Sequence, residues 1–241
     1  DIKFFVVNGL FGVSSSIIAY LSSIALGTPV AVAVTLSYLQ PMFSVILARL
    51  FLREGITPIK IIAVITSRFG ASIVSGLWQN FGTALSIPVL GVLLATMNGF
   101  FYSVYIIVGR LSGSNRNYHF ETTMFYSFFF GTLWSAPLWL FMSMFIKDQL
   151  VTGFALNFSA GALMMLLALI FAATVTPYGL LAMGLKRVNA SKAGIILLIE
   201  PVSVMLMGVL ILNQTLTFSD LAGATLILSA TALISTEGKM R

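Results

Sequence analysis

Two apolar stretches of equal length decide the fold: VAVAVTLSYLQPMFSVILARLFL at residues 30–52 and ASKAGIILLIEPVSVMLMGVLIL at residues 190–212. Near its middle, each carries a polar residue followed by proline, as Gln40-Pro41 and as Glu200-Pro201. Proline interrupts a helix by removing a backbone hydrogen bond, and inside a membrane the freed polar groups need partners. Two copies of one interrupted, polar-centred membrane helix predict a transporter.

The composition indicates an all-α membrane protein that crosses the bilayer several times. Hydrophobic residues make up 59% of the chain, charged residues 8%, and the mean hydropathy is +1.03. Apolar runs approach or exceed the roughly 20 residues that a transmembrane helix needs. They predict eight spans, at residues 4–26, 29–52, 59–77, 85–109, 122–146, 159–185, 190–212 and 216–235.

Metal and cofactor sites find little support in the sequence. Cysteine is absent, which excludes a disulfide framework and thiolate ligands, and the single histidine, His119, falls in a polar loop. We therefore expect no metal and no cofactor.

Basic residues orient the predicted bundle, because lysine and arginine are retained on the cytoplasmic side. With Asp1 inside, 11 of the 13 basic residues fall at cytoplasmic ends, and of the predicted outer loops only Lys147 carries one. Both termini are therefore expected in the cytoplasm and the protein in the inner (plasma) membrane. Orientation also explains the net charge of +6, so nucleic acid is not an expected partner.

The two stretches read as copies of one unit. Residues 30–76 align with 190–236 without gaps at an offset of 160, with six identities that carry little weight by themselves. The stronger signal is the shared order of span, central proline, polar break and second span. The break in the first copy carries Arg49, Arg53 and Lys60, whereas residues 213–220 carry no basic residue. Copies facing opposite sides predict an inverted repeat.

The sequence resembles the EamA type of the drug/metabolite transporter superfamily. The resemblance rests on Leu39-Gln40-Pro41 through Phe51-Leu52-Arg53-Glu54 and Ile56-Thr57, and on Ile199-Glu200-Pro201 through Leu210-Ile211-Leu212. It implies a bundle of ten helices in two inverted five-helix repeats. The eight spans would be helices three to ten, with the first two absent from this sequence. Residues 1–78 would then close the first repeat, and residues 79–241 would form the second. Gln214 departs from the family, which usually repeats the glutamate there.

Glu200 is the leading candidate for chemistry. An ionised acid near the middle of a span costs about 2.5–3.5 kcal/mol on insertion scales, so it requires protonation, a partner or water. It could bind an amine or a coupling proton. Alternatively, it hydrogen-bonds backbone freed by Pro201 or anchors a neighbouring helix. Gln40, its counterpart in the first copy, carries the same two interpretations.

Aromatic and polar side chains recur at helical spacing on two other spans. Ser16, Tyr20 and Ser23 share one face, and so do Asn98, Tyr102 and Tyr105. These stripes could line a cavity or pack helices together. In the resembled family, the equivalents of the first, second, fourth, sixth and seventh spans line the substrate cavity. The candidate substrate-binding residues are therefore Glu200, Gln40, Tyr20, Tyr38, Asn98, Tyr102 and Tyr178.

Arg68 is the one basic residue deep inside a span, so a partner is expected for it. We favour backbone carbonyls, or snorkelling to the interface, over an ion pair with Glu200.

These features favour a secondary active transporter over other classes of membrane protein. We expect it to export small polar or amphipathic metabolites, with amino acids favoured, by alternating access between two halves, with protons as one candidate coupling ion. A monomer and a homodimer both remain open. No enzyme is expected, because no carboxylate pair, histidine cluster or activated nucleophile occurs within the spans. A lipid flippase remains the alternative.

Overall fold

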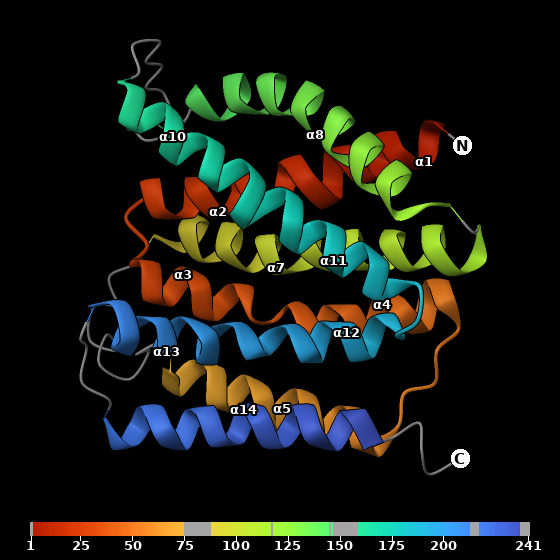
Figure 1. The fold of residues 1–241 in the computed structure, drawn as a ribbon, viewed down its shortest axis with the longest axis vertical. Helices are drawn as coiled ribbons and strands as arrows, with labels where there is room; N and C mark the ends of the chain where they lie inside the picture. Colours follow the sequence, from red (N-terminus) through yellow and green to blue (C-terminus); the bar gives the residue numbers. More distant parts are fainter. Residues whose placement is uncertain are drawn as a thin grey trace.

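The chain is an all-α membrane protein whose helices lie roughly side by side (Figure 1). The computed structural model describes residues 2–74, 88–116, 118–144, 146, 159–212 and 217–236. Within these ranges, seven helical runs are long and apolar enough to cross a bilayer, and α5 (Pro58–Val74) adds a shorter one. Each of the eight predicted spans thus contains helix in its described part. The predicted boundary between residues 78 and 79 lies outside the described residues.

The first three spans contain one straight helix and two with irregular centres. In the first span, a π-helical stretch joins two α-helices, and in the second a turn at Tyr38-Leu39 does so. The bounds are α1 Ile2–Val7, η1 Asn8–Ser15, α2 Ser16–Ala25, α3 Val30–Ser37, α4 Gln40–Leu52 and α5 Pro58–Val74.

After two long helices, the sixth, seventh and eighth spans repeat the pattern of the first three spans. A π-helical stretch interrupts the sixth span, and a short 3₁₀ turn interrupts the seventh. The bounds are α7 Val89–Arg110, η2 Leu111–Asn115, α8 Phe120–Ser143, α10 Ala160–Ala168, η3 Leu169–Val175, α11 Thr176–Leu185, α12 Ala190–Ile196, η4 Leu197–Ile199, α13 Glu200–Leu212 and α14 Phe218–Thr236.

Both prolines stand at the second position of a new helix rather than inside one. The α4 helix begins at Gln40 and the α13 helix begins at Glu200, each one residue before its proline. Proline suits the first turn of a helix, because the N–H that it lacks has no intrahelical acceptor there. The predicted interruption is therefore present, and it falls on the residues just before Gln40 and Glu200.

Four pairs of corresponding elements start 160 residues apart. The paired starts are Ser16 and Thr176, Val30 and Ala190, Gln40 and Glu200, and Pro58 and Phe218. In Figure 1, the members of each pair run in opposite directions across the bundle. The structural correspondence reaches further back than the aligned residues 30–76, because the first and sixth spans also match.

The last helices of the two series, α5 and α14, pack along their length at one edge of the bundle (Figure 1). A Cβ added at Gly70 would lie 2.6 Å from the carbonyl oxygen of Gly223, so these glycines bring the two backbones close together. Small residues permit such contacts between membrane helices.

The α1 helix begins and the α14 helix ends at the same end of the bundle, which we call the basic end (Figure 1). Nine of the ten described basic residues belong to helix ends and connections there: Lys3, Arg49, Arg53, Lys60, Arg110, Arg116, Lys186, Arg187 and Lys192. Next to these residues, α4, α7, α11 and α12 meet in an apolar cluster, which we call the plug. It consists of Leu47, Ala48, Ile106, Ile107, Leu185, Ala190 and Ala193. Arg110 adds hydrogen bonds of 2.8 Å from Nη1 to the carbonyl oxygens of Leu185 and Lys186. The basic end is therefore closed by packing and by polar contacts.

Glu54 ties the end of α4 to the start of α12. Its Oε1 accepts a hydrogen bond from the backbone N–H of Ala190 at 2.8 Å, and its Oε2 accepts from the Ser191 N–H at 3.2 Å and the Ser191 hydroxyl at 2.5 Å. The Lys60 ammonium lies 3.5 Å from the same Oε2, and both side chains are nearly inaccessible to solvent. Arg53, with a left-handed φ of 56°, ends α4 and turns the chain so that Glu54 follows directly.

Replacement of Glu54 by alanine should lower the free energy of unfolding by about 3 kcal/mol, because it leaves the buried Lys60 ammonium without its carboxylate. Titration with SDS in mixed micelles measures this change. The double variant Glu54→Ala with Lys60→Met should recover part of the loss. Glu121→Ala, which removes an exposed glutamate, is the matched control. Equal losses in Glu54→Ala and Glu121→Ala would contradict a stabilising role for the bridge.

Candidate functional site

Glu200 stands at the first position of α13, about 15 Å along the seventh span from Ala190 at 1.5 Å per residue. Its side chain is exposed. Among the described residues, no hydrogen bond or ion pair engages its carboxylate. The observed contacts therefore do not use Glu200 to hold the backbone at Pro201 or to anchor a neighbouring helix.

Four tyrosines from four other helices lie within electrostatic range of Glu200. The carboxylate interacts electrostatically with the phenol groups of Tyr20 on α2, Tyr38 at the end of α3, Tyr102 on α7 and Tyr178 on α11. All four side chains are half-buried. Five of the seven candidate residues are thus brought together in space, although they are far apart in the sequence.

An aromatic cluster closes this group of tyrosines on the side of α8. The rings of Tyr102 and Tyr105 stack with centroids 6.3 Å apart, and both meet Tyr178 edge to face, at 6.3 Å and 5.2 Å. Phe128 of α8 meets the Tyr178 ring at 5.0 Å and the Tyr105 ring at 6.5 Å. Tyr105 is 1% exposed, and its hydroxyl has no hydrogen-bond partner in the part of the chain that the structure describes. This cluster can offer ring faces to a cation, and the Tyr105 hydroxyl remains available as a donor.

The two candidate amides lie in contacts between helices. Gln40 is buried, and its Nε2 donates to the Ser44 hydroxyl one turn along α4 at 2.8 Å. A Cβ added at Gly194 of α12 would lie 3.0 Å from that nitrogen. Asn98 donates from Nδ2 to the carbonyl oxygen and the hydroxyl of Ser16 on α2, at 2.9 Å and 3.0 Å. Substrate contact by these two residues stays a prediction, and their observed contacts join helices.

Arg68 reaches a backbone carbonyl, as predicted. Its Nη1 donates to the carbonyl oxygen of Thr35 at 2.8 Å, and among the described residues it forms no ion pair with Glu200. The Thr35 carbonyl lies just before the turn at Tyr38-Leu39, where the regular helical acceptor pattern ends. The Arg68 side chain therefore supports the interruption of the second span.

Tyr105 and Phe128 were not among the candidate residues. Tyr105 lies on the stripe with Asn98 and Tyr102, but a stripe does not reveal which of its members face a site. Phe128 is one of several phenylalanines on α8, and its position beside Tyr178 depends on how α8 packs against α11. In the described part of the chain, no group of three histidine, cysteine, aspartate or glutamate side chains could hold a metal ion.

Comparison with known proteins identifies the family. Residues 1–76 and 89–236 match the EamA-like transporter family. A crystal structure described only as that of a protein has a similar fold, with a TM-score of 0.75 and 19% sequence identity over 95% of this chain and 76% of the other. No curated protein matches the sequence. The helical membrane fold and the match across nearly the whole chain agree, and the chain therefore belongs to the EamA-like transporter family of the drug/metabolite transporter superfamily.

Proposed function

We propose that the protein is a secondary active transporter that exports small amphipathic metabolites carrying an amine, amino acids among them. The observation that carries the proposal is the Glu200 carboxylate, which lies at mid-span without a hydrogen-bond partner among the described residues and within electrostatic range of four tyrosines. A lone carboxylate at membrane depth is costly, and a bound cation offsets that cost.

An ammonium group suits these surroundings in two ways. The carboxylate attracts the charge, and the tyrosine rings add cation–π attraction of about 0.5–2 kcal/mol where water is excluded. A proton neutralises the same carboxylate. Amine and proton would therefore compete for one site, and this competition couples the export of one to the entry of the other.

Alternating access requires two halves that move around a shared site. The offset of 160 residues and the opposite directions of corresponding helices support two inverted halves, which meet at residues 78 and 79 in a ten-helix plan. The plug and the Glu54 bridge close the basic end, whereas Glu200 is exposed. Opening of the basic end would separate α4 from α12. The excess of basic residues at that end supports a cytoplasmic location for both termini in the plasma membrane.

Glu200→Gln should abolish the pH dependence of transport and slow efflux at least tenfold, because the amide can neither attract an ammonium group nor carry a proton. In the unmodified protein, efflux should fall as the loading side is acidified, since a protonated Glu200 no longer attracts the amine. Efflux of radiolabelled amino acids from proteoliposomes measures both effects. Glu121→Gln, at the exposed start of α8, is the control.

Two outcomes of the Glu200 experiment would count against the proposal. If rate, affinity and pH dependence all survive in Glu200→Gln, the carboxylate has a structural role. If the same proteoliposomes scramble a fluorescent lipid but release no amino acid, the protein is a flippase.

A disulfide across the basic end should stop transport if that end must open. The chain contains no native cysteine, so Ser44→Cys with Gly194→Cys introduces one pair. A Cβ at position 194 would lie 3.0 Å from the Cβ of Ser44, slightly closer than the roughly 3.5–4.5 Å of a relaxed disulfide. Efflux should fall at least tenfold after oxidation and return on reduction. Each single variant controls for crowding at the contact, and unchanged efflux from the crosslinked protein would contradict opening at this place.

A further inference from the structure

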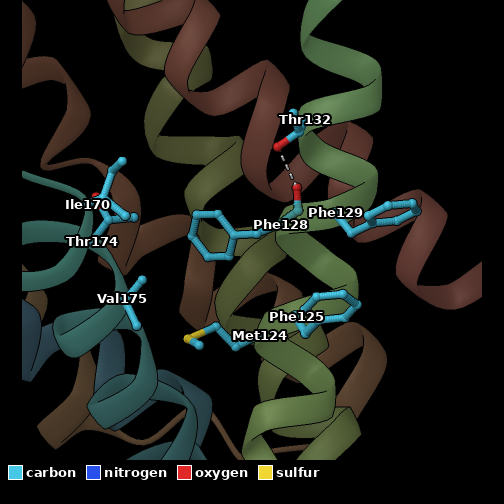
Figure 2. Close-up of a pocket in the computed structure, with 8 residues that line it drawn as sticks. All are labelled: Met124, Phe125, Phe128, Phe129, Thr132, Ile170, Thr174 and Val175. Atoms are coloured by element: carbon cyan, nitrogen blue, oxygen red, sulfur yellow. Dashed lines mark hydrogen bonds between the residues drawn. The ribbon is translucent and has the colours of Figure 1, made fainter. Parts of the chain in front are cut away.

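A pocket of about 460 Å³ lies between α8 and η3, and most of the residues that line it are exposed. Its apolar lining consists of Met124, Phe125, Phe128, Phe129, Ile170 and Val175. Figure 2 shows the Phe128 ring directed from α8 toward the η3 side chains. The volume falls in the range of about 300–1,000 Å³ that is usual for small-molecule sites.

The polar atoms of the pocket lining are already engaged. Thr132 donates its hydroxyl to the carbonyl oxygen of Phe128 at 3.0 Å (Figure 2), and Thr174 donates its own to that of Leu169 at 3.1 Å. Each hydroxyl thus donates its one hydrogen bond to a carbonyl oxygen of its own helical span. The pocket therefore suits a hydrocarbon or aromatic group and offers little to a polar one.

Two observations join the pocket to Glu200. The Phe128 ring forms a wall of the pocket and also meets the Tyr178 ring at 5.0 Å, and Tyr178 interacts electrostatically with Glu200. The depths also agree: Val175 lies ten residues before the end of α11 at Leu185, and Glu200 lies ten residues after the start of α12 at Ala190. Both ends belong to the basic end, so both residues lie roughly 15 Å into the bundle.

We propose that this pocket is the apolar subsite of the transporter, and that it holds the hydrocarbon or aromatic group of the amine whose ammonium binds Glu200. The inference rests on the proposed function and narrows the substrate class to amphipathic amines with an apolar group. A single molecule would span from Glu200 past Tyr178 to Phe128.

Binding of primary alkylamines tests this assignment directly. Ethylamine through hexylamine are titrated calorimetrically into the protein in lipid nanodiscs at neutral pH, with empty nanodiscs subtracted to remove partitioning into lipid. Each added methylene should lower the dissociation constant about fourfold, since burial of one CH₂ contributes about that factor. Affinity that does not depend on chain length would overturn the proposal.

Two substitutions on the sixth span distinguish binding of the alkyl chain in the pocket from binding elsewhere. Val175→Phe fills the pocket and should remove most of the gain from ethylamine to hexylamine, while ethylamine binds as in the unmodified protein. Leu180→Phe places the same ring on an exposed position outside the lining and should keep the full gain. A gain that persists in Val175→Phe would place the alkyl chain elsewhere, in the bilayer or against its lipid chains, and would overturn the proposal.

If the proposed function is wrong, the binding measurements give a different result than if only the apolar subsite is wrong. Ethylamine should bind through Glu200 alone, so Glu200→Gln should weaken it at least tenfold in the presence or absence of the Val175 substitution. If ethylamine binds equally well to Glu200→Gln, the cation site is wrong. If ethylamine depends on Glu200 but longer chains bind no better, the cation site stands and the apolar subsite is wrong.

Discussion

The hydrocarbon core of a membrane offers no hydrogen bonds, and this constraint governs the rest of the structure. Every backbone group has to find a partner within the protein, so an interrupted helix is tolerated only where other groups take over. The second and seventh spans are both interrupted, just before Gln40 and just before Glu200. In the second span, Arg68 supplies a donor to the carbonyl of Thr35, and Gly99 of α7 approaches the carbonyl of Ser37 closely. Both contacts support the backbone of the second span next to its interruption.

The equivalent residues Gln40 and Glu200 have different surroundings in the two copies. Gln40 is buried against Gly194, and its amide is engaged on its own helix, so the first copy serves to pack α4 against α12. Glu200 occupies the equivalent position of the second copy, yet it is exposed and faces tyrosines from four helices. A neutral amide satisfies itself locally at low cost, whereas a carboxylate needs a counter-charge or a proton. This difference between two equivalent residues is the reason why the proposed function rests on Glu200 rather than on Gln40.

The side chains inside the bundle differ between its basic end and its middle. Near the basic end, apolar packing and the Glu54 bridge join α4 to helices of the second half, and the Arg110 contacts join α7 to the end of α11. Above this closed layer, aromatic side chains replace aliphatic ones, first around Tyr105 and then around Glu200. The proposed alternating access rests on these two layers, one that would bind and one that would separate.

Local composition was enough to predict the helical membrane class and the apolar spans, because hydropathy and helix-breaking residues act within a few residues of each other. Sequence also marked Glu200, since a carboxylate in a span is conspicuous in any context. It did not reveal the π-helical stretches at residues 8–15 and 169–175, nor the bridge from Glu54 to Ala190 and Ser191. Nor did it show that Phe128 and Tyr105 close the site, whereas Gln40 and Asn98 join helices. Residues on one helical stripe look alike in sequence, and which of them meet a partner depends on the neighbouring helices, so only the packing of the bundle separates a binding residue from a structural one.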